Sequence, residues 1–132
     1  MCPAPQHLIE CGCSIAAFPY TSNSNLLKQL LFEIHPGDLV LLHQSIREGA
    51  IGPYNRTIAA ELSVADLPLD RYRYVFAGDY HKRQFFGPDN RVHYIGSPLQ
   101  LKFDEAGEEK GFTLLDTETW QMNTILTDAP RR

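Results

Sequence analysis

The sequence predicts an α/β fold, α+β-like in its second half, in which apolar strands and a flanking helix precede a C-terminal antiparallel meander. The run at 39–42, Leu-Val-Leu-Leu, is continuously apolar, which is typical of a strand buried on both faces. Apolar residues recur at helical spacing over 26–34, just before that strand. Beyond residue 91, short strand-like segments alternate with Gly-, Glu- and Thr-rich turns, a pattern that indicates antiparallel pairing.

In the N-terminal part, residues 7–17 mix β-branched and small side chains, which predicts one strand. The polar run 21–25 then predicts a loop, in which Ser24 or Asn25 caps the following helix. The segment 35–38, His-Pro-Gly-Asp, ends that helix. Its apolar stripe must pack on a sheet and consists of Leu26, Leu27, Leu30, Leu31 and Ile34.

The rest of the chain reads as a loop, a short helix and four strands. Residues 44–56 carry Gly and Pro and predict a long, polar-lined loop of the kind that shapes a site in α/β folds. Residues 58–62 predict a short helix, and 72–77 predict the next strand. Three further strands would form the antiparallel meander, at 92–95, 111–116 and 122–126.

Composition places the chain among ordinary one-domain proteins. With 132 residues, 43% of them hydrophobic, it can bury a real core, so we expect a single domain over 1–132 with a loose tail at 128–132. The sequence has no membrane-length apolar run and no secretory signal pattern, and we therefore expect a cytoplasmic protein without a membrane partner. Three cysteines without framework spacing favour a reducing compartment, and we expect Cys11 and Cys13 to be small core residues rather than a soft-metal pair.

Charge limits the binding modes that are open to the chain. The net charge of −4 argues against a protein that holds nucleic acid chiefly by a basic surface. One local concentration of basic and aromatic residues exists at 71–83, where a solvated strand edge and a phosphate-facing patch are equally supported.

Candidate metal ligands stand where predicted strands end. Asp79 and His81 lie in a glycine-led loop directly after the strand 72–77, and His43 follows the strand 39–42. Carboxylate oxygen and imidazole nitrogen are what a divalent metal that activates water requires. Three such ligands predict half of a hydrolytic metal centre. His7, His35 and His93 lack that placement, and we expect them to be structural.

Four ordered motifs resemble the calcineurin-like metallophosphoesterase superfamily, and within it the DNA-repair nuclease branch typified by the nuclease subunit of the bacterial SbcCD complex and by phage relatives. These are Leu-Leu-His-Gln-Ser at 41–45, Gly-Asp-Tyr-His at 78–81, Gly-Ser-Pro-Leu at 96–99 and Lys-Gly-Phe at 110–112. The resemblance covers residues 7–126 and corresponds to the C-terminal half of the family's domain, which implies a partial metallophosphoesterase sandwich.

The chain departs from the family pattern in two ways. Asp79 stands where the family has His, and a carboxylate suits Mn or Mg at that position. The family's earlier motifs, Asp-x-His, Gly-Asp-x-x-Asp and Gly-Asn-His-Asp or Glu, are absent, and with them the bridging carboxylate. The resemblance therefore implies a phosphodiesterase portion that is incomplete alone, completed by an N-terminal half-domain or with its exposed apolar surface covered in a homo-oligomer.

The resemblance also implies roles for residues and partners. His43 and Asp79 would bind one ion and His81 the other, with Mn favoured and Mg or Zn as alternatives, all weakly bound without the missing half. Substrate contacts would come from Tyr80, Lys82, Arg83 and Ser97. The substrate would be DNA or another phosphodiester, and a further partner would be an ATPase of the SbcC kind.

Two other interpretations stay open. A domain that has lost half of its metal ligands could persist as a noncatalytic interaction or assembly module, because fold does not fix function. Alternatively, the chain could be a complete small phosphatase with unfamiliar ligands. That enzyme would need a carboxylate to reach the centre of His43 and His81 from Asp66, Asp70, Asp104 or Glu105.

Overall fold

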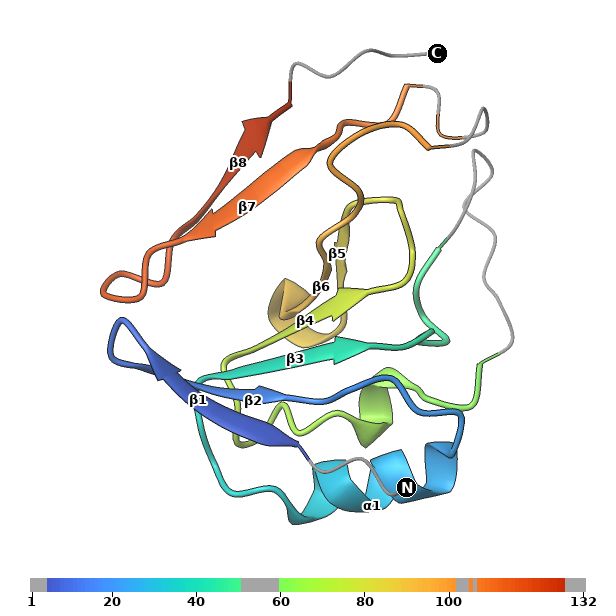
Figure 1. Ribbon diagram of the computed structural model, residues 1–132, viewed down its shortest axis with the longest axis vertical. Coiled ribbons are helices and arrows are strands. Elements are labelled where there is room, and N and C mark those ends of the chain that lie inside the picture. Colours follow the sequence, from blue (N-terminus) through green and yellow to red (C-terminus); the bar gives the residue numbers. More distant parts are fainter. Residues whose placement is uncertain (1–4, 51–59, 102–104, 106, 128–132) are drawn as a thin grey trace.

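A six-stranded mixed sheet forms the body of the protein, in the strand order β1-β2-β3-β4-β6-β5, and confirms the α/β class (Figure 1). The computed structural model describes residues 5–50, 60–101, 105 and 107–127. Strands β2, β3, β4 and β6 run parallel to one another, and β1 and β5 are antiparallel edges. The bounds are β1 Gln6–Glu10, β2 Cys13–Ala17, β3 Leu39–His43, β4 Tyr74–Gly78, β5 Gln84–Phe86 and β6 Val92–Tyr94.

The core lies between this sheet and helix α1 (Ser24–Glu33), which covers one sheet face in Figure 1. Strand register sets two rows of side chains on that face, because residues two apart on a strand point the same way. One row joins Val40, Val75 and Val92, and the next contains Ala77 and Tyr94. Leu27 and Leu31 of α1 are buried against them, as the apolar stripe predicts.

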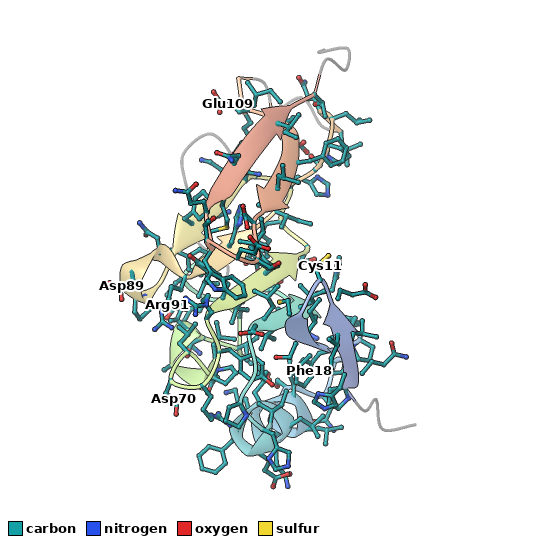
Figure 2. All side chains as sticks on the ribbon, turned by 90° about the vertical axis from the view of Figure 1, so that its left-hand side faces the viewer. Cys11, Phe18, Asp70, Asp89, Arg91 and Glu109 are labelled. Carbon is teal, nitrogen blue, oxygen red and sulfur yellow. The ribbon has the colours of Figure 1, made fainter. Side chains whose placement is uncertain are left out.

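The expected single strand at 7–17 is wrong, because the chain reverses in its middle. Cys11 and Gly12 both have positive φ, 51° and 73°, and they join β1 to β2 as a two-residue hairpin turn. Such a turn needs left-handed backbone at both central positions, which glycine adopts at little cost. Cys13 is buried as expected, but Cys11 lies exposed at the hairpin tip, so its expected core position is also wrong (Figure 2).

Helix α1 is held at both ends by side chains. Asn23 caps its start, where the side-chain oxygen accepts a hydrogen bond from the Leu26 amide at 3.1 Å, so the expected cap at Ser24 or Asn25 is wrong by one or two positions. At the other end, the guanidinium of Arg71 donates to the carbonyls of Leu31, Phe32 and Ile34. Arg71 therefore satisfies carbonyls that a helix end leaves open, a structural role.

The middle of the chain follows the prediction in part. Strands β3 and β4 form where 39–42 and 72–77 predict them, each shifted or extended by one or two residues. The short helix at 58–62 is wrong in its described part, because Leu62 forms a parallel β-bridge with Ile46. A 3₁₀ turn, η1, follows at Val64–Asp66. Residues 51–56 of the predicted loop 44–56 lie outside the described residues, as does the tail at 128–132.

The predicted three-stranded meander is also wrong. Segment 92–95 forms β6, which pairs in parallel with β4 inside the main sheet, while β5 and the 3₁₀ turn η2 (Pro88–Asn90) precede it. Burial explains the choice, since Val92 and Tyr94 extend the two core rows. The remaining segments pair with each other as an antiparallel hairpin, β7 (Gly111–Leu115) and β8 (Met122–Leu126).

The β7–β8 hairpin lies on the side of the main sheet opposite α1 (Figure 1). Side chains connect it to the body: Arg83 donates to Thr113 at 2.7 Å, and the Arg73 guanidinium lies 4.3 Å from the centre of the Trp120 ring. Within the described residues, no helix has the length and apolar character that crossing a membrane requires.

His93 of β6 is a buried histidine without a hydrogen-bonding partner for either ring nitrogen in the described structure. Its ring stacks on Phe85 with centroids 4.0 Å apart and lies 5.5 Å from the Phe76 centroid. Burial, assisted by the positive charge of Arg83, lowers the pKa of His93 to about 4. The neutral ring is therefore the form that the fold accepts.

We predict that His93 makes the fold sensitive to acid. As pH falls below about 6.5, the unfolded chain binds a proton at His93 that the folded chain does not bind until about pH 4, so stability drops by roughly 1 kcal/mol per pH unit between these values. Urea unfolding of wild type and His93→Phe across this window measures the difference. His35→Gln, which removes an exposed histidine, is the control and should retain the wild-type slope. Equal slopes for wild type and His93→Phe would contradict the assignment.

Candidate functional site

The carboxyl ends of three parallel strands meet at one edge of the main sheet. His43 is the last residue of β3 and lies in register beside Gly78, the last residue of β4. Asp79 follows at once, and the turn 96–99 comes just after β6. In α/β folds, ligands bind outside the carboxyl ends of the strands, so this edge is the candidate ligand-binding site.

His43 and Asp79 form an adjacent pair of metal-type donors at this edge. Nε2 of His43 lies 3.9 Å from Oδ1 of Asp79, and their side chains are 62% and 36% exposed. Two neighbouring ligands of a six-coordinate ion with bonds near 2.1 Å lie about 3.0 Å apart. The pair is therefore slightly wider than a bound ion needs, and rotation of the exposed His43 ring can close it.

The neighbours of this pair restrict it in two ways. The Ser45 hydroxyl donates to Oδ2 of Asp79 at 2.6 Å, which leaves Oδ1 as the oxygen nearer His43. Gly78 makes room for the imidazole, because a Cβ there would lie 2.8 Å from Nδ1 of His43. A side chain at 78 would therefore force the His43 ring out of its observed position.

Asp79 also holds an unfavourable backbone conformation, with φ at 120°. Non-glycine residues in such regions cost on the order of 1–3 kcal/mol and persist where the surrounding structure imposes them. Here the imposing structure is the end of β4 and the hydrogen bond from Ser45. Strain of this kind concentrates at functional sites.

Two stacked tyrosines form the floor beneath the loop. The rings of Tyr80 and Tyr94 lie 4.5 Å apart, and the Tyr94 hydroxyl accepts from the Ile46 amide at 2.9 Å and donates to the Gln44 carbonyl. Burial raises the pKa of both phenols, so both are neutral at physiological pH. The Tyr80 hydroxyl is buried beside Ser45 without a well-formed hydrogen bond. Tyr80, expected to contact substrate, thus packs under the site.

His81 is half-buried and contacts a separate polar cluster whose central members, Glu105 and Lys110, are buried. Its Nδ1 lies 2.9 Å from Oε2 of Glu105, whose Oε1 lies 2.9 Å from Nζ of Lys110. Lys110 also donates to the His81 carbonyl and to Glu108, each at 2.9 Å. Burial alone would raise the pKa of Glu105, but hydrogen bonds from His81 and Lys110 outweigh it and lower the pKa to about 2. Glu105 is therefore ionised.

The other expected substrate contacts hold the loop and the hairpin together. Arg83 donates to Thr113 of β7, and its guanidinium lies 5.7 Å from the Phe85 centroid. Ser97 is buried, its hydroxyl donates to the Leu99 carbonyl, and its amide donates to the His81 carbonyl at 3.1 Å. Lys82 is half-buried in the same loop.

The structure thus brings together two of the three expected ligands, His43 and Asp79, and connects the third, His81, to Glu105 instead. Across residues 5–50, 60–101, 105 and 107–127, no three His, Cys, Asp or Glu side chains gather as a group that could hold an ion. No known family model matches the sequence.

The carboxylates named for a complete small phosphatase are scattered, apart from Glu105. Asp66 lies 3.7 Å from Lys28 and bonds to Ser63 at the start of η1, while Asp70 pairs with Arg71 and points outward (Figure 2). Asp104 lies outside the described residues. Glu105 does reach His81, although 24 residues separate them and no local pattern signals the contact. Ser45 belongs to the motif at 41–45, but the sequence assigned it no role, and its hydrogen bond to Asp79 is apparent only in the folded chain.

We predict that the strain at Asp79 can be measured with a pair of variants. Asp79→Gly and Asp79→Ala both lose the carboxylate, but only glycine relieves φ at 120°, so Asp79→Gly should be the more stable by about 1 kcal/mol after its larger unfolded-state entropy. Denaturant unfolding gives the comparison. At exposed Asp70, which is not in a left-handed conformation, the order should reverse, with alanine the more stable. Alanine more stable at both positions would contradict strain at Asp79.

Proposed function

We propose that this chain contributes part of a divalent-metal site that hydrolyses phosphoesters, with DNA or another phosphodiester as the substrate. The observation that carries the proposal is the pair at the carboxyl edge of the sheet: His43 and Asp79 lie 3.9 Å apart at the ends of two register-matched parallel strands. Imidazole and carboxylate are both ligands of the ions that catalyse such reactions.

His43 and Asp79 are of the donor types that such an ion takes, but they are fewer than the ligands it needs. The hard oxygen of Asp79 and the borderline nitrogen of His43 suit Mn, with Mg or Zn as alternatives. When bound, the ion would supply Lewis acidity and a lowered pKa of its water. Ser45 would keep Asp79 turned toward His43 through its 2.6 Å hydrogen bond. Because two protein donors leave most coordination positions to water, binding by this chain alone should be weak.

Full activity would then need ligands from outside this chain, in keeping with the resemblance to one half of a metallophosphoesterase domain. His81 would serve a second ion, and the remaining donors, among them a bridging carboxylate, would come from an N-terminal half-domain. An ATPase of the SbcC kind stays a proposed partner on the same ground. The cytoplasm is the proposed compartment, from the cysteine content of the sequence.

We predict weak Mn binding that depends on His43 and Asp79. Electron paramagnetic resonance of free Mn, titrated with protein, should show one site in the millimolar range that His43→Ala or Asp79→Asn abolishes. Asp70→Asn and His7→Ala, which change exposed side chains on other elements, should bind as wild type does. Hydrolysis of a model phosphodiester by the chain alone should be slow or undetectable. Mn binding that survives His43→Ala and Asp79→Asn together would falsify the proposal.

A second candidate, a noncatalytic interaction module, is favoured by the outer face of the β7–β8 hairpin. Phe112, Leu114 and Ile125 are 59%, 58% and 53% exposed, and they share one face because Phe112 is the register partner of Ile125. Residues 119–127, which include β8, carry no charged side chain. Edge strands that stay unpaired usually carry charge or proline, so an uncharged edge beside an apolar face suits pairing with a second copy.

We predict that this face makes the chain self-associate. Sedimentation velocity of wild type should show concentration-dependent association, and the double variant Phe112→Thr/Ile125→Thr should sediment as a monomer, because threonine keeps β-propensity while removing apolar surface. A matched control, Ile9→Thr/Phe32→Thr, removes exposed apolar side chains from β1 and α1 and should associate like wild type. A wild type that remains monomeric at all concentrations would exclude a second copy as the partner.

A further inference from the structure

A buried ion pair stands behind the ring of His81. Glu105 and Lys110 are both buried, with Oε1 of Glu105 2.9 Å from Nζ of Lys110 and 3.2 Å from the amide nitrogen of Leu101. Both of these neighbours are donors, so Oε1 accepts two hydrogen bonds. Oε2, the remaining oxygen, lies 2.9 Å from Nδ1 of His81.

The pair is not explained by stability alone. Burial of a Lys–Glu pair costs desolvation that its attraction barely repays, and well-packed apolar side chains of similar size are often as stable or more so. What an apolar pair could not supply is a fixed acceptor for the His81 ring. An ionised carboxylate only accepts hydrogen bonds, so a ring nitrogen held 2.9 Å from it must be the one that carries the hydrogen.

We propose that Glu105 is a positioning residue for His81: with Lys110 it holds the ring proton on Nδ1, so that Nε2 keeps its lone pair for an ion or a proton. Lys110 adds a backbone restraint, since it also donates to the His81 carbonyl at 2.9 Å. The loop that carries Asp79 and His81 is thereby anchored at its ring and at its main chain. The use of the Nε2 lone pair rests on the proposed function, but the ring geometry does not.

The placement of the hydrogen has a chemical consequence. In a neutral imidazole one nitrogen donates and the other accepts, and the partner of the first decides which is which. Histidines that ligate metals usually donate their second N–H to a carboxylate or carbonyl, and loss of that partner costs about 10–100-fold in metal affinity. Glu105 stands in that relation to His81.

The test is the tautomer of His81, read from long-range proton–nitrogen NMR of the metal-free chain at a pH where the ring is neutral. Wild type should show a protonated Nδ1 and a bare Nε2. Removal of Glu105 alone would take its closest buried partner from Lys110 and leave Glu108 as the remaining ion-pair partner, so the informative variant is Glu105→Leu/Lys110→Met, which replaces both buried charges with apolar side chains. Its His81 should move its hydrogen to Nε2 or sample both tautomers. Glu108→Gln, which alters Lys110's other partner without touching His81, should leave the wild-type pattern.

A protonated Nε2 in wild type, or an unchanged tautomer in a folded Glu105→Leu/Lys110→Met variant, would overturn the inference. Folding of the variant is checked by circular dichroism, and if it fails to fold, the wild-type spectrum alone decides. Both proposals are supported if His43→Ala abolishes Mn binding and the wild-type chain carries the His81 hydrogen on Nδ1. Mn binding indifferent to His43, together with the expected tautomer, would remove the proposed function and leave the role of Glu105 standing.

Discussion

The parallel pairing of β3 with β4 is the constraint on which the candidate site depends. Both strands are continuous with the core on the α1 face, through Val40 and Val75, and their register is fixed by that burial. Because the strands run in the same direction, His43 and Gly78 end side by side and Asp79 begins the loop next to the imidazole. A shift of one residue would turn His43 to the other face and the apolar side chains out of the core.

The stacked pair of Tyr80 and Tyr94 fixes the positions of the segments that follow β3 and β4. Tyr94 extends a core row and bonds through its hydroxyl to the main chain at 44 and 46, so the segment after His43 is held to β6. Tyr80 stacks on Tyr94 beneath the loop that carries Asp79. The strained φ of Asp79 is therefore maintained by packing and by Ser45.

The spacing of apolar residues in the sequence predicts the elements that bury an apolar face. Features that depend on a positive φ or on contacts between distant residues are not predicted. Helix α1 and strand β3 follow from apolar spacing, and so does the placement of His43 and Asp79 at strand ends. The turn at Cys11 and Gly12 was missed because a two-residue reversal leaves the apolar pattern almost unbroken. The partner of His81 is 24 residues away, and only the folded chain brings Glu105 to it. The sequence of segment 92–95 fits a meander strand equally well. In the fold it pairs with β4 instead, because Val92 and Tyr94 then extend the two core rows.

The two sides of the main sheet differ in how many energetically unfavourable features they contain. The α1 face is apolar packing of Val, Leu and Ala with satisfied helix ends. Toward the carboxyl edge and the hairpin side, the chain retains a strained Asp79, a buried unpartnered His93 and the buried Glu105–Lys110 pair. Each of these costs free energy that an apolar or glycine substitute would avoid. Of the three, Asp79 directly follows β4 and the Glu105–Lys110 pair contacts His81 two residues further on, so these two costs fall on one loop, where local rules are expected to break if chemistry or binding rather than stability shapes the residues.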